Sequence, residues 1–112
     1  MARHVLLHRL YNIKAQHMNR NTPEIRQVMA FVSIIETGSF THAAKKLNLT
    51  QSAISHSLRS LEEILETKLL VRRGKIHCLT DTGEVFLGHA RVVVRELEKA
   101  SRSIDRLEKK VS

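Results

Sequence analysis

The chain has 112 residues, of which 42% are hydrophobic, and this suits one small domain with a modest core. Its net charge is +8, with 19 Lys and Arg against 11 Asp and Glu, which favours an anionic partner. A single cysteine excludes an internal disulfide, and no apolar run approaches the roughly 18 residues of a membrane-spanning helix. We therefore expect a reducing, cytoplasmic setting and no membrane partner.

Residues 1–20 form a basic leader that contains four Lys and Arg and no acid. His17-Met18 is the junction commonly left when a coding sequence is joined to an expression vector. Three origins stay open: a vector-derived leader with a native start at Met18, a transit peptide, or a genuine extension. We leave this segment out of the fold and expect it to be poorly ordered.

Two helices are predicted in the next segment, with their ends marked by capping residues. The first starts at Thr22-Pro23-Glu24, where a hydroxyl cap, a proline and an acid follow one another. It ends at Thr37-Gly38, because glycine readily takes the left-handed conformation that closes a helix. Ser39 is expected to cap a short helix from Phe40 to Leu47, and Asn48 to begin a three-residue turn.

The third predicted helix, residues 51–65, is amphipathic in an unusual way. Thr50 is expected to cap it, and its buried stripe is Ile54, Leu58, Leu61 and Leu65. The opposite face carries mostly short side chains that form hydrogen bonds. It consists of Gln51, Ser52, Ser55, His56 and Arg59. Glu62 and Glu63 are expected to lie in solvent near the helix end.

Two short strands, "KLLVR" and "KIHCLT", are predicted around a basic tip at Arg73-Gly74. Between Ser39 and Thr80, seven Lys and Arg face three Glu, so much of the positive charge lies on this part of the chain. Arg72, Arg73 and Lys75 lie on this hairpin and are expected to contact the anionic partner. Cys78 is expected to be a small buried residue.

The last predicted helix, from Asp81 to Val111, has apolar residues at alternating spacings of four and three. This heptad pattern predicts a dimerisation seam, made of Phe86, Ala90, Val93, Leu97, Ala100, Ile104, Leu107 and Val111. The alternative for Phe86 and Ala90 is packing against their own domain. From Asp81 onward the basic and acidic residues are nearly balanced in number.

A short helix, a turn, a helix with a polar face and a basic hairpin form the pattern of a mainly α, winged helix-turn-helix domain. The major groove of B-DNA is about 12 Å wide and accepts one α-helix, and short polar side chains let that helix sit deep. Glutamine can pair with adenine and arginine with guanine, whereas serine suits phosphates or bases. We expect residues 21–80 to form this domain and residues 81–112 a linker helix.

The segments "ETGSFTHAAKKLNLTQSAISHSLRSLE" and "LTDTG" closely resemble the N-terminal DNA-binding domain of LysR-type transcriptional regulators. The resemblance covers roughly residues 24–110. It implies recognition positions at Gln51, Ser52, Ser55, His56 and Arg59, backbone contacts at Thr41 and Thr50, and a wing contact at Arg72. It also implies an antiparallel pair of linker helices.

Several residues depart from the family pattern. Glu66 stands where a helix-ending glycine is usual, Leu70 replaces a frequent phenylalanine, and His77 and Cys78 occupy wing positions that are more often aliphatic and basic. A larger effector-binding domain, and with it a small-molecule inducer, is expected in family members after the linker helix. An excised domain and a naturally short protein both stay open for this chain.

Our main hypothesis is that the chain is part of a bacterial, nucleoid-associated regulator. It would bind double-stranded DNA sequence-specifically, as a homodimer on an inverted repeat. A winged domain related to molybdate-responsive regulators is a second, which the serine-rich "TQSAISHS" disfavours. A dimerisation or adaptor protein without specific DNA binding is a third. We expect no enzyme, cofactor or metal site, because His4 and His8 lack an accompanying acid or cysteine and Ser55-His56 lacks an orienting carboxylate.

Overall fold

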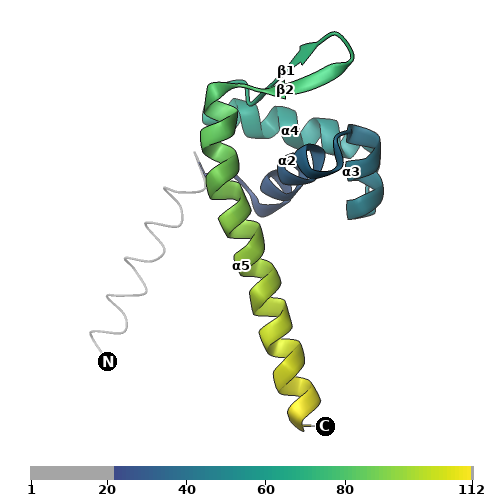
Figure 1. Cartoon of the computed structure of the whole chain (residues 1–112), viewed down its shortest axis with the longest axis vertical. Coiled ribbons are helices and arrows are strands. Elements are labelled where there is room, and N and C mark those ends of the chain that lie inside the picture. Colours follow the sequence, from purple (N-terminus) through teal and green to yellow (C-terminus); the bar gives the residue numbers. More distant parts are fainter. Residues whose placement is uncertain (1–21, 112) are drawn as a thin grey trace, which may run out of the picture.

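The computed structural model describes residues 22–111. Its elements follow in the order α2 (Ile25–Thr37), α3 (Phe40–Leu47), α4 (Gln51–Leu65), β1 (Leu70–Arg73), β2 (Ile76–Leu79) and α5 (Asp81–Val111). Figure 1 shows α2, α3 and α4 packed together, the hairpin projecting at one end, and α5 running away from them as a rod. The predicted mainly α, winged helix-turn-helix fold is confirmed. The leader predicted at residues 1–20 lies outside the described residues.

Helix α2 starts later than the sequence suggested. Its N-cap is Glu24, whose backbone N–H donates to Oε1 of Gln27 at 2.9 Å, so the predicted start at Thr22-Pro23 is wrong. The reciprocal Glu/Gln arrangement takes the place of a hydroxyl cap. The predicted end is confirmed, because Gly38 has a φ of 83° and its N–H donates to the carbonyl of Ile34 at 2.9 Å.

The predicted caps of the helix-turn-helix are confirmed. The Ser39 hydroxyl accepts the backbone N–H of His42 at 3.0 Å, and the Thr50 hydroxyl accepts that of Ala53 at 3.1 Å. Asn48 takes the left-handed conformation with a φ of 58°. These three local features fix where α3 begins and ends and where α4 begins.

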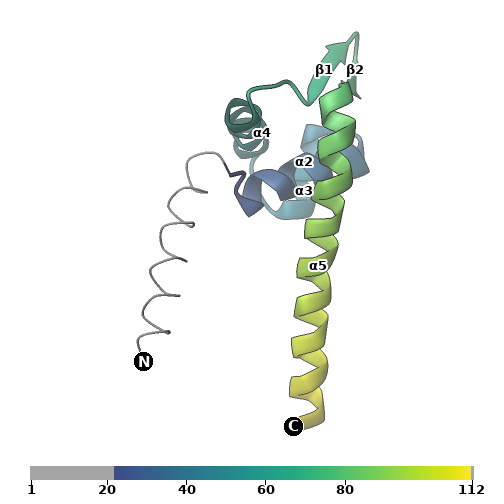
Figure 2. The same cartoon turned by 90° about the vertical axis from the view of Figure 1, so that its left-hand side faces the viewer.

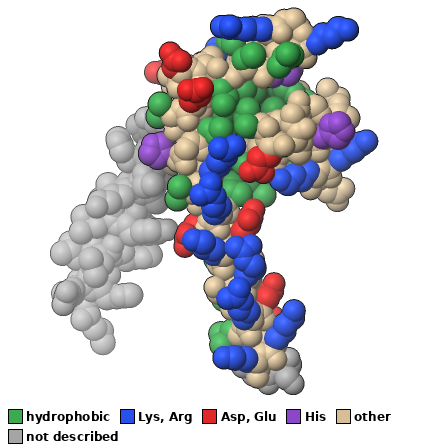
Figure 3. All heavy atoms as spheres, viewed as in Figure 1, with side chains coloured by type: hydrophobic (Ala, Val, Ile, Leu, Met, Phe, Trp, Pro, Cys, Tyr) green, Lys and Arg blue, Asp and Glu red, His purple; other side chains and the backbone are tan. Residues whose placement is uncertain are grey.

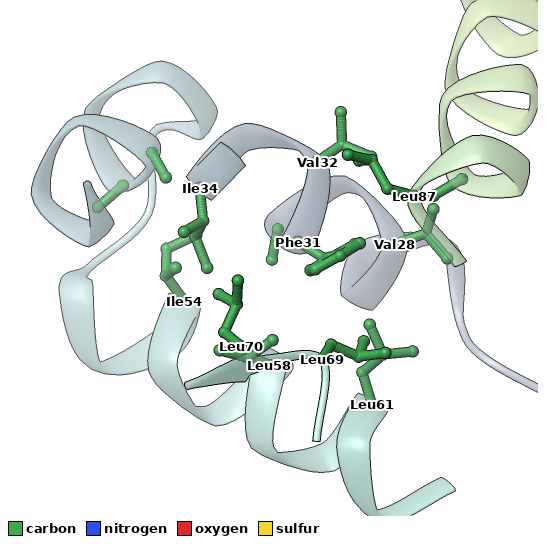
Figure 4. Packing of buried hydrophobic residues seen from close by; sticks show 14 residues of the cluster. Val28, Phe31, Val32, Ile34, Ile54, Leu58, Leu61, Leu69, Leu70 and Leu87 are labelled. Atoms are coloured by element: carbon green, nitrogen blue, oxygen red, sulfur yellow. The ribbon is translucent and has the colours of Figure 1, made fainter. Parts of the chain in front are cut away.

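The hydrophobic core centres on α2, which lies between α4 and α5. Figure 2 shows α4 and α5 at opposite sides of the domain. Phe31 of α2, Ile54 and Leu61 of α4, and Leu69 of the following loop are fully buried, and Figure 4 shows them converging. The predicted stripe of α4 is therefore confirmed at Ile54, Leu58 and Leu61, while Leu65 is half-buried.

The hairpin is antiparallel, with Arg72 opposite His77 and Arg73 opposite Ile76. The turn consists of Gly74 and Lys75, and Gly74 has a φ of 64°. Arg73 is thus the last residue of β1 rather than part of the turn. Cys78 is half-buried rather than fully buried.

The loop between α4 and β1 is held by a buried carboxylate. Glu62 is only 9% exposed, so the prediction that it lies in solvent is wrong. Its Oε2 accepts the backbone N–H groups of Leu69 at 2.7 Å and Leu70 at 3.4 Å, and Nζ of Lys68 lies 3.7 Å from its Oε1. A buried carboxylate is stable here because it compensates two backbone donors in a segment that enters the core.

The same loop anchors the start of α5. The carbonyl of Leu69 accepts the N–H of Thr80 at 3.0 Å, and the Thr80 hydroxyl donates to the carbonyl of Lys68 at 2.6 Å and accepts the N–H of Gly83 at 2.9 Å. Gly83 packs directly on Leu69, where a Cβ atom would overlap the carbonyl oxygen. We call this set of contacts the Leu69 junction, and it explains the motif "LTDTG" physically.

Gly83→Ala is expected to lower the free energy of unfolding by about 1–3 kcal/mol, because the added methyl must displace backbone at the junction. Gly88→Ala is the matched control, since a Cβ at Gly88 meets open space on the same helix. The control should raise stability by up to about 1 kcal/mol, as alanine is the better helix former. Urea unfolding of both variants measures the difference, and equal effects would contradict the packing at Gly83.

Glu62→Ala is expected to lower the free energy of unfolding by about 1–3 kcal/mol, because two backbone donors lose their acceptor. Glu63→Ala removes the neighbouring, exposed carboxylate and should change stability by less than about 0.5 kcal/mol. Thermal unfolding of the two variants is the measurement. A Glu62 variant as stable as the Glu63 variant would remove the carboxylate from the Leu69 junction.

Candidate nucleic-acid interface

The polar face of α4 lies on the surface of the domain. Gln51, Ser52, His56 and Arg59 are exposed and Ser55 is half-buried, whereas the apolar stripe of the helix points into the core. The helix ends at Leu65, and Glu66 takes the left-handed conformation with a φ of 55°. The missing family glycine therefore leaves the helix end in place. The side chains expected to read bases are free to contact a partner.

A groove of about 420 Å³ connects α4 with the hairpin. Five of the predicted DNA-binding residues line it, namely Thr41, Gln51, Ser55, Arg72 and Lys75. Two cations and no carboxylate occur among its described lining residues, so its charge suits a phosphate chain. We call it the wing groove.

Within the wing groove, two contacts position predicted residues. The Thr41 hydroxyl donates to Oε1 of Gln51 at 3.4 Å, which links the start of α3 to the start of α4. Nε of Arg72 donates to the carbonyl of Gly74 at 3.0 Å, which holds the guanidinium against the hairpin turn. Both contacts reduce the freedom of side chains that would otherwise be ordered only on binding.

The sequence did not identify Ser39, Phe40 and His77 as part of this surface, yet they also line the wing groove. The imidazole of His77 lies on the ring of Phe40, with centroids 4.8 Å apart and planes inclined by 49°. This contact fixes the hairpin against α3. The hairpin register could have identified His77 from the sequence, because a two-residue turn at Gly74 and Lys75 places His77 opposite Arg72.

The other predicted DNA-binding residues lie outside the wing groove. His56 borders a hollow on the α2 side of α4, and Arg59 borders one shared with Glu62, Glu63 and Glu66. Arg73 is exposed on the hairpin but does not line the groove. The remaining two, Thr50 and Ser52, are exposed at the start of α4.

The predicted seam of α5 divides into two parts. Ala90 is 1% exposed and belongs to the core of its own domain, whereas Phe86 is half-buried and packs on Phe31 with ring centroids 5.7 Å apart. The burial of Ala90 therefore corrects its assignment to a dimer seam, while the assignment of Phe86 stays a prediction. The neighbouring Leu87 is also buried, although the heptad pattern omits it.

Farther along α5 the seam residues face outward. Leu97 is 39% exposed, Ile104 57% and Leu107 60%. The remaining members, Val93 and Ala100, are exposed as well, and Val111 ends the helix with its side chain outside the described part. Val85 and Val92 add further exposed apolar surface. We call the outward-facing residues from Val85 to Leu107 the apolar stripe of α5.

Among residues 22–111, no group of three His, Cys, Asp or Glu side chains is placed to hold a metal ion. His4 and His8 lie outside the described residues. None of the described helices has the length and apolar character needed to cross a membrane.

The helix-turn-helix, its exposed polar face and the basic hairpin define a winged helix-turn-helix domain of the DNA-binding type. The chain belongs to the bacterial regulatory helix-turn-helix proteins of the lysR family, whose family model matches residues 25–84. This membership confirms the resemblance read from the sequence and favours it over a molybdate-responsive regulator. The family consists of transcriptional regulators, so an enzymatic role is set aside.

Relatives and solved structures agree with this membership. The chain is 46% identical over 79 residues to the uncharacterized HTH-type transcriptional regulator YvbU of Bacillus subtilis, covering 70% of this chain and 27% of YvbU. It is similar to the BenM DNA-binding domain in complex with catB site 1 DNA, with a TM-score of 0.67 and 31% identity over 75% of this chain and 94% of that chain. The CbnR DNA-binding domain in complex with DNA gives a TM-score of 0.60 and 37% identity, over 80% and 99%.

Proposed function

We propose that this chain binds double-stranded DNA sequence-specifically as the DNA-binding part of a LysR-type transcriptional regulator. The observation that carries the proposal is that the polar face of α4 and the cationic wing groove meet on one surface. The described BenM and CbnR domains, which are similar over most of their length, were solved in DNA complexes. The chain spans about a quarter of YvbU, so the activity of a full-length regulator is also a proposal.

In this proposal α4 enters the major groove and the hairpin follows the DNA backbone. Gln51 and Arg59 contact base edges, because an amide and a guanidinium can each form two hydrogen bonds with one base. Ser52, Ser55 and His56 contact bases or phosphates beside them. The backbone contacts come from Thr41, Thr50, Arg72, Arg73 and Lys75. This division assigns sequence discrimination to α4 and salt-dependent affinity to the wing.

Arg59→Ala is expected to lower the preference for the selected site over random DNA by about 1–3 kcal/mol, the range for one good base contact. Arg72→Ala should weaken both DNAs alike and reduce the salt slope of log K by about 0.9, as one phosphate contact is lost. Fluorescence anisotropy against a duplex first selected from a random pool measures both quantities.

Lys46→Ala is the control for both variants, because Lys46 is an exposed cation that pairs with Glu36 of α2 and borders none of the hollows described above. Its discrimination and salt slope should equal those of the wild type. If Arg59→Ala kept full discrimination and unfolded at a lower temperature, the proposed orientation of α4 would be wrong.

The apolar stripe of α5 supports a second part of the proposal, namely a homodimer that binds an inverted repeat. A rod from Val93 to Leu107 extends about 21 Å, and its leucine and isoleucine side chains each gain about 1.5–3 kcal/mol on full burial. A mostly apolar groove of about 370 Å³, lined by Leu65, Leu69, Val85 and Phe86 among others, continues the stripe at the head of α5. An antiparallel partner helix would place its far end there.

Ile104→Asp is expected to convert a dimer into a monomer that still unfolds cooperatively, because the carboxylate would be buried without a partner in the seam. Ser103→Asp adds the same charge at the neighbouring exposed position and should leave the dimer intact. Sedimentation equilibrium at micromolar concentration is the measurement. A monomeric wild type would contradict dimerisation through α5.

A cysteine pair tests the orientation. Leu97 lies near the middle of the stripe, so two antiparallel copies bring this residue close to itself. In a Cys78→Ser background, Leu97→Cys should therefore form a disulfide between chains, whereas Ile104→Cys should not. Crosslinking of both variants would indicate parallel helices.

As a working assignment, the dimer acts in the bacterial cytoplasm, associated with the nucleoid, by occupying its site and so changing transcription. Small-molecule control would require an effector domain of the kind inferred above from the resemblance. An adaptor that uses only the apolar stripe is the competing function, and the anisotropy experiment separates the two.

A further inference from the structure

Six cations follow one another along α5, of which Arg91 is half-buried and the other five are exposed. They are spaced by four, four, three, four and four residues, which keeps them on one side of a helix, and they are Arg91, Arg95, Lys99, Arg102, Arg106 and Lys110. Figure 3 shows Lys and Arg side chains gathered down the visible face of this helix. We call this set the basic stripe.

The basic stripe is separated from the acids of the same helix. At about 100° per residue the six cations fall within a sector of roughly 100°. Glu96, Glu98 and Asp105 lie outside that sector. Between Arg91 and Lys110 this helix face therefore carries charges of one sign, whereas Asp81 and Glu84 lie on the same face before the stripe begins, and it shares only Val92 with the apolar stripe.

Few of these cations are neutralised. Lys99 lies 3.9 Å from Glu96, and Arg102 lies 3.9 Å from Glu98, with both pairs exposed. No ion pair within 4.0 Å is formed by Arg91, Arg95 or Arg106 in the described part of the chain. Like charges one turn apart oppose helix stability, so this arrangement does not serve folding.

The basic stripe faces away from the proposed DNA-reading surface. In Figure 2, α5 and α4 occupy opposite sides of the domain with α2 between them. Figure 3 views the molecule from the α5 side, and there Lys and Arg side chains are in view along the rod. A duplex lying against α4 and the wing would leave these cations exposed.

We propose that the basic stripe binds the phosphate backbone of a second DNA duplex while α4 and the wing hold the first. This inference rests on the proposed function. The stripe extends about 28 Å, and four of its six cations are arginines, which match phosphate oxygens with two parallel hydrogen bonds. An anionic polymer is the ligand that such an extended row of like charges recognises.

A protein partner fits the stripe less well. The core of a protein interface is rich in aromatic and other apolar residues and poor in charged ones, although arginine is enriched there. Within the sector of the basic stripe, Val92 is the one apolar side chain between Arg91 and Lys110 of the described helix. Contacts to the stripe are thus almost purely electrostatic, as in sequence-independent binding to DNA.

The experiment uses the selected duplex, immobilised on beads and loaded with protein, and then a fluorescent duplex of random sequence. Arg95→Gln/Arg106→Gln removes two cations of the stripe. Lys45→Gln/Lys46→Gln, with two exposed cations in the last turn of α3, has the same net charge and serves as the control. Retention of the fluorescent duplex is measured against salt concentration.

The wild type and the control should retain the second duplex. For the stripe variant, the dependence of log K for the second duplex on log salt concentration should be smaller by about 1.8, because two phosphate contacts are lost. All three proteins should bind the immobilised duplex equally. Equal retention by the stripe and control variants would overturn the proposal. So would a wild type that retains no second duplex at about 50 mM salt, and the stripe would then suit an acidic protein surface.

Failure of the proposed function has a different signature, because the wild type would then not bind the selected duplex at all. In that case the two double variants are compared on the random duplex alone. A smaller salt slope for the stripe variant supports the basic stripe, and equal slopes overturn it.

Discussion

The placement of every functional surface in this molecule depends on the backbone of Leu69. Its N–H is accepted by the buried carboxylate of Glu62 on α4, and its carbonyl accepts the N–H of Thr80 before α5. The side chain of Leu69 is fully buried, and Gly83 packs on its carbonyl. One peptide segment therefore connects the end of α4, the root of the hairpin and the first turn of α5. Hydrogen bonds on both sides of this segment set the angle at which α5 leaves the domain.

This junction separates the proposed functions in space. Because α4 and α5 pack on opposite sides of α2, the polar face of α4 and the outward faces of α5 do not compete for one partner. The hairpin, which starts at the same junction, is held on the α4 side by the contact between His77 and Phe40. The proposed DNA reading and dimerisation can therefore proceed together on a domain whose core centres on α2.

Local features were predictable from the sequence because they depend on neighbouring residues. Gly38, Ser39, Asn48 and Thr50 take the predicted conformations or caps, since each acts within a few residues of itself. The burial of Glu62 was not predictable in this way. Its partners are backbone groups seven and eight residues later in an irregular loop, and no periodic pattern marks them. In the same way, Ser39, Phe40 and His77 were not predicted to line the wing groove, because only the fold brings the start of α3 next to the hairpin.

Helix α5 shows why a periodic pattern predicts a face but not the partner of that face. The heptad spacing continues without interruption, yet Phe86 and Ala90 pack on their own domain while Leu97 and Ile104 face outward. Heptad periodicity records only that a position is apolar, and α2 covers only the first turns of the rod. Charge shows the same limit of sequence patterns. The numbers of basic and acidic residues along α5 are nearly equal, yet the cations from Arg91 onward lie on one side of the helix. Beyond the domain, the apolar stripe and the basic stripe point in different directions. A second chain and an anionic polymer can therefore bind the same rod at once.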